Sequence, residues 1–483
     1  MPNLFRKKCG LEPSPRFFSR FQPARLSVYT LALVIAVGTF LLMLPWAHTG
    51  APAWPNENPT DPTTATPVAG INLGGAPLSV AFFTAVSATS VTGLVVADTA
   101  TYWSGFGMVI LAILIEIGGL GTMTLGALMA LLVAHKLNLR QRLLIASTTG
   151  NITYADIQGL VKRIVKYSAI LQLFFTPFIF LGLILDGENW YTALGNSLFL
   201  SVSAFNNAGF SPYPDNLVHQ GTNLLIVIPV MLLLVLGGLG FPVMLQVWSS
   251  LRQSPDRQPN WTLNTRIVLS ATAVLILVGW LLIVIAEWHN PATIANAPLS
   301  EKLLLTLFTA ISPRTAGFNV MDIASQSDIT WLITDFLMFI GAGPAGTAGG
   351  IKVTTAVILV FIVYTEVRAG DAVQLFERRI GRSAQRQAIT VVILAFVLLI
   401  LATATILAQT HFRLDQVLFE VVSAMSTVGL STGITNHLPV SSQLVLCILM
   451  FFGRIGPVTI ASALALRPIR RRYEYPKERP IIG

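Results

Sequence analysis

The stretch Ser203-Ala-Phe-Asn-Asn-Ala-Gly-Phe210 recurs in related form at three other places in the chain. The other copies are Ser87-Ala-Thr-Ser-Val-Thr-Gly-Leu94, Ile311-Ser-Pro-Arg-Thr-Ala-Gly-Phe318 and Ser423-Ala-Met-Ser-Thr-Val-Gly-Leu430. Their glycines, Gly93, Gly209, Gly317 and Gly429, are separated by 116, 108 and 112 residues. This even spacing predicts that the chain consists of four versions of one structural unit.

The composition is typical of a polytopic membrane protein. Hydrophobic residues make up 53% of the 483 residues and charged residues only 11%, whereas about 25% of the residues of a soluble domain are charged. The formal net charge of +9 does not indicate that the protein binds nucleic acid, because the basic residues lie on one predicted side of the membrane. Cys9 and Cys447 are the only cysteines, which excludes a disulfide framework and a thiolate metal site.

Long and short apolar runs alternate along the chain. A membrane crossing needs roughly 20 apolar helical residues, and eight runs meet this length, at about 26–45, 103–133, 164–185, 224–248, 267–285, 329–364 (interrupted), 388–407 and 443–466. Four shorter runs, at about 78–88, 193–205, 299–312 and 414–425, end at the glycine motifs. They are too short to cross, so we expect half-helices buried in the membrane. Ordinary apolar loops are the alternative. Four short apolar runs at the same place in each repeat, each ending at the same glycine motif, argue against this alternative.

The predicted fold is therefore all-α, with eight transmembrane helices in four pseudo-symmetric repeats around a central ion pore. We expect an N-terminal tail (1–25), repeats at 26–135, 136–250, 251–366 and 367–466, and a C-terminal tail (467–483). Of the 31 Lys and Arg residues, 26 fall in the two tails and in the loops between repeats. This bias predicts that both tails are cytoplasmic. We expect the protein to lie in the plasma (inner) membrane.

The glycine motifs carry the chemistry of an ion filter. A ring of backbone carbonyls can replace the water around a cation, and glycine allows such a turn because it adopts positive φ without strain. A half-helix that ends at the ring would also favour cations through the negative end of its dipole. None of the four motifs contains a carboxylate, which favours a monovalent cation. The predicted ion-binding residues are Val91, Thr92, Gly93, Asn207, Ala208, Gly209, Thr315, Ala316, Gly317, Thr427, Val428 and Gly429.

These four motifs, together with the glycine-rich segment and the arginine described next, resemble the Trk/Ktr/HKT superfamily of potassium transporters, and within it the KtrB type of membrane subunit. The resemblance covers about residues 25–466. It implies that the transported ion is K⁺, bound at Gly93, Gly209, Gly317 and Gly429. The Trk-type subunit has two further N-terminal helices, for which we expect no room before Leu26. A transporter of Na⁺, or of both ions, within the same superfamily is the alternative.

The sixth apolar run is interrupted by Gly341-Ala-Gly-Pro-Ala-Gly-Thr-Ala-Gly-Gly350. Glycine and proline at this density cannot continue a helix, and such backbone occurs at membrane depth only where protein buries it or it lines water. The resemblance implies a loop that obstructs the pore below the filter; a simple packing kink is the alternative. The predicted gate residues are Gly341, Gly343, Pro344, Gly346, Thr347, Gly349, Gly350 and Arg454.

Arg454 lies inside the last apolar run, where an isolated charge costs about 2.5–3.5 kcal/mol. We therefore expect it to face a polar interior beside the glycine-rich segment, as the matching arginine of the superfamily does. The alternative is an arginine that backbone carbonyls satisfy and that only fixes helix packing. Arg314 is expected to brace its own half-helix. The roles of Glu116, Asp335, Glu420 and Lys352 stay open.

Other classes of function find little support. The chain has no Gly-x-Ser-x-Gly, His-Glu-x-x-His or phosphate-binding Gly-x-x-x-x-Gly-Lys motif, so we expect no enzyme. A broken-helix symporter of organic solutes is the more serious rival, although such carriers have two halves rather than four equal units. The resemblance further implies a homodimer, a cytosolic RCK-type subunit that binds ATP or ADP, and in parts of the superfamily Na⁺ as an activator. Anionic membrane lipid explains the basic loops equally well.

Overall fold

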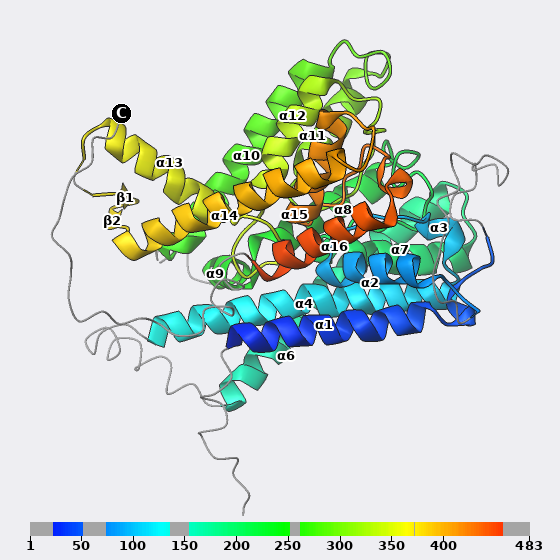
Figure 1. Ribbon diagram of the computed structural model, residues 1–483, viewed down its shortest axis with the longest axis horizontal. Helices are drawn as coiled ribbons and strands as arrows, with labels where there is room; N and C mark the ends of the chain where they lie inside the picture. Colours follow the sequence, from blue (N-terminus) through cyan, green and yellow to red (C-terminus); the bar gives the residue numbers. More distant parts are fainter. Residues whose placement is uncertain (1–22, 52–73, 136–153, 252–260, 371, 457–483) are drawn as a thin grey trace, which may run out of the picture.

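The computed structural model describes residues 23–51, 74–135, 154–251, 261–370 and 372–456. Over these residues the protein is almost entirely helical (Figure 1). An outer helix, a shorter helix, a glycine turn and a second helix follow one another four times. The protein is thus an all-α polytopic membrane protein, as its composition predicts. Residues 1–22 of the predicted N-terminal tail and the whole predicted C-terminal tail lie outside the described residues, whereas residues 23–25 begin α1.

The helices of the four units follow the sequence order. The first unit contains α1 (Pro23–Leu42), α2 (Leu78–Ser90) and α4 (Gly105–His135), and the second contains α6 (Tyr154–Leu185), α7 (Trp190–Asn206), α8 (Leu224–Leu239) and α9 (Phe241–Leu251). The third contains α10 (Leu263–Glu287), α11 (Leu299–Ile311), α12 (Asp328–Phe339) and α13 (Val353–Val367), and the fourth α14 (Arg382–Leu407), α15 (Leu414–Ser426) and α16 (Val440–Ile455). Minor elements are α3 (Thr99–Tyr102), the antiparallel strands β1 (Gln374–Leu375) and β2 (Arg378–Arg379), and 3₁₀ turns at Pro45–Ala47 and Thr435–His437.

The four half-helices form the centre of the bundle. Their lengths are 13, 17, 13 and 13 residues for α2, α7, α11 and α15, close to the predicted bounds. Each packs against helices of its own unit and against the second helix of the preceding unit: α7 on α4, α11 on α8, α15 on α12, and α2 on α16. The last of these contacts closes the series. The four units therefore surround a common centre in chain order.

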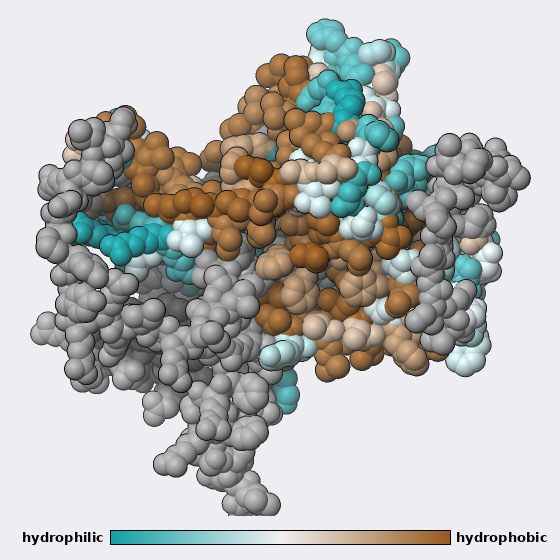
Figure 2. Space-filling view, viewed as in Figure 1, coloured by the Kyte–Doolittle hydropathy of each residue, from teal (hydrophilic) through white to brown (hydrophobic). Residues whose placement is uncertain are grey.

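The outer surface is apolar, as contact with lipid requires. Exposed side chains on the long helices include Leu33, Leu173, Leu281 and Phe396, and hydrophobic residues cover the middle of the face in Figure 2. Among the described residues, four helices are long and apolar enough to cross a membrane, and the bent pair α8 and α9 adds a fifth. Shorter apolar helices include parts of α1, α13 and α16, so the full count of eight crossings stays a prediction.

One predicted crossing is strongly bent. Residues 224–248 were expected to form one membrane crossing, and within them the chain bends by 107° between α8 and α9. Gly240, at the bend, has φ +91° and cannot continue a helix. The glycine loop, defined here as residues 340–352, fills the break, since the Phe241 N–H donates to the Ala345 carbonyl oxygen at 3.2 Å.

The predicted interruption of residues 329–364 is confirmed. Helix α12 ends at Phe339 and α13 begins at Val353. The two ends of the glycine loop are joined, because Gly341 N–H donates to Ile351 O at 2.8 Å and Val353 N–H donates to Ala342 O at 3.1 Å. The loop therefore interrupts a broken helix, and its two ends are hydrogen-bonded to each other. The predicted final run, 443–466, is described only as far as residue 456.

Candidate functional site

The four glycine turns share one backbone conformation. Residues Val91, Asn207, Thr315 and Thr427 are all left-handed, with φ between 51° and 70°. Two positions later the four glycines again have positive φ, at +92°, +71°, +73° and +94°. Three half-helices reach this conformation through a Schellman ending, in which Thr92, Ala208 and Val428 donate their N–H to the carbonyls of Ser87, Ser203 and Ser423. The second left-handed position of each turn is therefore occupied by glycine, the residue that adopts positive φ without strain.

The third turn differs from the others in detail. Pro313 has no N–H to donate, and Ala316 N–H bonds to Ser312 O at 2.9 Å, one residue closer than in the other repeats. Thr315 and Gly317 nevertheless have the same left-handed φ as their counterparts. The third motif thus arrives at the shared conformation by a shorter hydrogen-bonded ring.

The glycines of the four turns meet in a closed ring. A Cβ on Gly93 would overlap the Ala208 carbonyl oxygen, and one on Gly209 would lie 2.9 Å from the Ala316 carbonyl oxygen. A Cβ on Gly317 would overlap the carbonyl oxygen of Val428, and one on Gly429 that of Thr92. Each glycine thus faces the next repeat in chain order, and the fourth faces the first. No side chain can be added at any of the four positions without displacing backbone.

The residues beside these glycines are buried in the same place. Thr92, Ala208, Thr315, Thr427 and Val428 have no exposed surface, and Val91, Asn207 and Ala316 have at most 2%. The structure therefore brings together all twelve residues that the sequence singles out for ion binding. Their carbonyls belong to turns at the ends of four half-helices, so the negative ends of four dipoles point toward one region.

Serines that the sequence reading did not single out hold the turns. Ser87 Oγ accepts the Gly93 N–H at 3.1 Å, and Ser423 Oγ accepts the Gly429 N–H at 3.0 Å. Ser203 Oγ donates to the Phe210 carbonyl oxygen at 2.7 Å, and Ser312 Oγ donates to that of Phe318. The signal was present, because three of the four motifs begin with serine and the third has it one position later.

A second set of glycines lets the inner helices approach the turns. A Cβ on Gly118, Gly237 or Gly453 would overlap the carbonyl oxygen of Thr89, Phe205 or Met425, each two residues before the left-handed position of its repeat. In the third repeat the corresponding residue is Gly341, where the glycine loop begins and where a Cβ would meet Gly349 O at 2.6 Å. In the third repeat the glycine loop therefore begins at the position where α4, α8 and α16 pack against the turns of the other three repeats.

The glycine loop lies directly against the turns. Thr347 Oγ1 is 3.5 Å from Phe205 O and 3.4 Å from Asn207 Oδ1, and a Cβ on Gly349 would overlap Thr427 Oγ1. Gly343 N–H donates to Gly238 O at 2.9 Å. The loop thus contacts the second and fourth turns and the end of α8.

Three cationic side chains bond to this loop. Arg454 Nη1 donates to the Thr347 carbonyl oxygen, and Arg454 Nη2 donates to Gly118 O at 2.6 Å. Lys352 Nζ donates to Ala348 O at 2.6 Å. Arg314, expected to brace its own half-helix, instead has Nη2 3.3 Å from Thr272 Oγ1 on α10 and 3.5 Å from the Gly341 carbonyl oxygen.

The three carboxylates of the apolar runs have different surroundings. Glu116 accepts from Asn206 Nδ2 at 2.5 Å, Gln172 Nε2 at 3.0 Å and Ser168 Oγ at 3.1 Å, so it supports the second turn from behind. Glu420 accepts from the hydroxyls and backbone of residues 431–435, beyond the fourth turn. Asp335 Oδ1 is buried and has no hydrogen-bond partner among the described residues.

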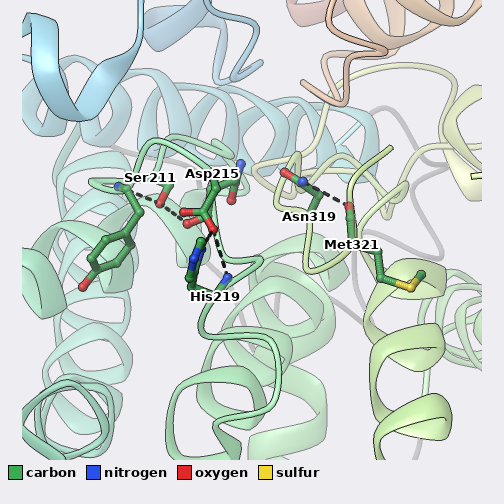
Figure 3. Close-up of polar contacts among 7 residues, drawn as sticks. Ser211, Asp215, His219, Asn319 and Met321 are labelled. Atoms are coloured by element: carbon green, nitrogen blue, oxygen red, sulfur yellow. Dashed lines mark hydrogen bonds and ion pairs between the residues drawn. The ribbon is translucent and has the colours of Figure 1, made fainter. Parts of the chain in front are cut away.

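The loop after the second turn carries further polar contacts, shown in Figure 3. His219 and Asp215 face each other there, with the His219 N–H donating to Asp215 Oδ2 at 3.0 Å. The hydrogen bond of the imidazole to Asp215, followed by the negative charge of that carboxylate, raises the pKa of His219 above its ordinary value. Nearby, the Tyr213 hydroxyl donates to Glu188 Oε1 at 2.5 Å, and burial first, then this carboxylate, raises the pKa of Tyr213.

Four helical units that close around a ring of glycine turns, inside an apolar shell, define a polytopic membrane protein. Residues 70–469 match the family described as TrkH, cation transport protein. The chain therefore belongs to the TrkH family of cation transport proteins, whose members are transporters and not enzymes.

Individual relatives agree with this assignment. The chain is 34% identical over 448 residues to the Ktr system potassium uptake protein B of Bacillus subtilis, covering 92% of this chain and 94% of that one. It is 33% identical over 413 residues to the potassium/sodium uptake protein NtpJ of Enterococcus hirae, covering 83% and 89%. The crystal structure of the potassium transporter TrkH from Vibrio parahaemolyticus has the same fold, with a TM-score of 0.70 at 16% identity over 94% of this chain and 86% of that chain.

Proposed function

We propose that this protein takes up potassium across the plasma membrane through a filter formed by its four glycine turns. The observation that carries the proposal is the closed ring in which Gly93, Gly209, Gly317 and Gly429 each face the next repeat. The names of relatives at 32–34% identity, which are Ktr potassium uptake proteins, support K⁺ as the ion.

In this proposal the backbone carbonyls of the turns replace the hydration shell of the ion. The ligands come from residues 91–93, 207–209, 315–317 and 427–429. The dipoles of α2, α7, α11 and α15 favour a cation at their C-terminal ends. Because the motifs have no carboxylate, the site favours a weakly hydrated monovalent ion over a divalent one.

The glycine loop and Arg454 act as the gate. Support comes from the position of Thr347 and Gly349 beside the second and fourth turns. The hydrogen bonds from Arg454 to Thr347 O and Gly118 O would hold the loop closed. Opening requires these bonds to break or exchange, so the gate changes the rate of transport and leaves the choice of ion to the filter.

The subunit arrangement is also a proposal. The four repeats correspond to residues 26–135, 136–250, 251–366 and 367–466, with both tails in the cytosol. The protein forms a homodimer, lies among anionic lipids and is regulated by a cytosolic RCK-type subunit that binds ATP or ADP, with Na⁺ as an activator. The word "system" in the names of the Ktr relatives supports a membrane subunit that works with other components.

A second candidate is uptake of both Na⁺ and K⁺. It is favoured by one specific observation, the 33% identity to a relative named potassium/sodium uptake protein. The two candidates share the same filter and differ only in how well the ring excludes Na⁺.

The experiment is flux into proteoliposomes that contain the purified full chain. Rubidium uptake is measured with K⁺ or Na⁺ as the competing ion. Competition by K⁺ at concentrations where Na⁺ has no effect supports potassium uptake, and equal competition supports the mixed transporter. Absence of any cation flux from liposomes that contain folded protein contradicts both.

A further inference from the structure

A side chain outside the glycine motifs joins two of the four turns. Asn216 lies in the loop between α7 and α8, and its Nδ2 is 3.4 Å from the Gly209 carbonyl oxygen and 3.4 Å from the Gly317 carbonyl oxygen. One amide therefore donates to the glycines of the second and third repeats. We propose that Asn216 is a specificity-determining residue that fixes the separation of these two carbonyls, an inference that rests on the proposed filter.

The loop holds Asn216 firmly in this position. Its φ of +63° lies in the left-handed region that asparagine tolerates better than most residues. Ser211 Oγ donates to the Asn216 carbonyl oxygen at 2.8 Å, and Asn216 N–H donates to Tyr213 O at 3.2 Å. The backbone N–H and the backbone carbonyl of Asn216 are therefore both hydrogen-bonded within the loop.

The same loop is tied to the segment that follows the third turn. Leu217 N–H donates to the Asn319 carbonyl oxygen at 3.1 Å, and Asn319 Nδ2 donates to Met321 O at 3.1 Å (Figure 3). Because residues 217 and 319 are bonded, Asn216 keeps its place relative to both glycines. It contacts the turns as part of a link between repeats and not as a free side chain.

The chemistry of the amide suits this role. Two carbonyl oxygens that converge on an ion repel each other, and an N–H donor between them offsets that repulsion. Asn216 Oδ1 is buried and has no hydrogen-bond partner, so in the described part of the chain the side chain acts only as a donor. No side-chain amide of the described residues donates to the carbonyls of Gly93 or Gly429. The bridge is thus confined to one side of the ring.

Two substitutions test this without backbone strain. Asn216→Gly removes the donor and accepts the positive φ at no steric cost. Asn216→Asp keeps the shape of the side chain and also tolerates this φ, but it places an acceptor against two carbonyls. His219→Ala is the matched control, because the His219 side chain is 82% exposed on the same loop and makes no contact with the glycines.

The readout is the K⁺/Na⁺ ratio in rubidium competition in proteoliposomes, measured beside Gly317→Ser. We expect Asn216→Gly to lower the ratio about two- to tenfold, the range that one net hydrogen bond corresponds to. Asn216→Asp should lower it at least as far, and His219→Ala should leave it unchanged. If Gly317→Ser alters the ratio while both Asn216 variants retain it, the inference is overturned and the filter stands. If the wild-type chain has no K⁺-selective flux, both fail.

Discussion

Arg454 and Gly118 are joined by a hydrogen bond of 2.6 Å between the guanidinium Nη2 and the backbone carbonyl oxygen. Through Nη1 the same guanidinium donates to Thr347 in the glycine loop. Arg454 therefore links α16, α4 and the loop, which belong to three different repeats. Both partners are backbone carbonyls, and this explains how a charged side chain that is only 5% exposed is tolerated here.

Replacing Arg454 should open the gate. Arg454→Met removes both donors but keeps an unbranched side chain of similar length. One hydrogen bond from a charged group is worth about 1.5–3 kcal/mol, so we expect rubidium flux to rise about tenfold or more with an unchanged K⁺/Na⁺ ratio. Arg413→Met is the control, because the Arg413 side chain is 67% exposed at the start of α15. Unchanged flux in Arg454→Met would refute the gating role.

Shortening the glycine loop should act in the same direction. The ends are already paired at Gly341–Ile351 and Ala342–Val353, so deletion of residues 343–348 leaves these pairs in place. Flux should rise while the competing-ion profile stays that of the wild type. A shortened loop with wild-type flux in a folded protein would mean that residues 340–352 only fill space.

Glu116 should contribute to stability through the second turn. Glu116→Leu removes both carboxylate oxygens, so that Asn206 and Gln172, which donate to Oε2, lose their shared acceptor. A buried donor left without a partner costs about 1–3 kcal/mol, so the free energy of unfolding should fall by this amount. Thermal unfolding of the purified protein measures the change. Glu377→Gln, at an exposed position of the hairpin turn, should not lower the melting temperature.

The His219–Asp215 pair predicts a pH dependence outside the membrane. Because the pKa of His219 is raised in the folded protein, the pair contributes fully below the unfolded pKa of about 6.5 and is lost as the pH rises through the higher folded value. Nitrogen NMR of labelled histidine should show His219 titrating above pH 6.5. In Asp215→Asn the titration should move back toward 6.5; an unchanged midpoint would show that Asp215 does not cause the shift.

Much of the fold follows from the sequence because its repeats are regular. The four glycine motifs located α2, α7, α11 and α15 to within three residues at each end, since a half-helix, its ending and its glycine lie within one continuous stretch. The broken helix around residues 341–350 was visible for the same reason. The sequence was sufficient to predict an element wherever the interactions that form it join residues close together in the chain.

The rest depends on contacts between distant residues. Gly240 and Pro242 gave a signal for the bend between α8 and α9, but the surrounding apolar run concealed it, and the loop that fills the break lies about 100 residues further on. Val91 adopts a left-handed φ of 57° that a β-branched residue rarely takes. Asn216 lies in an irregular loop between two predicted elements, and nothing in the chain around it indicates that it reaches Gly209 and Gly317.

The most direct test of the glycine ring is the K⁺/Na⁺ ratio of Gly317→Ser. A Cβ at Gly317 overlaps the Val428 carbonyl oxygen, so serine must displace the ring where we propose that the ion binds. Gly433→Ser is the matched control, because Gly433 has φ +90° but no atom within 4 Å of an added Cβ. The account predicts a ratio lowered about tenfold or more in Gly317→Ser and unchanged in Gly433→Ser. Wild-type selectivity and transport in Gly317→Ser would contradict it.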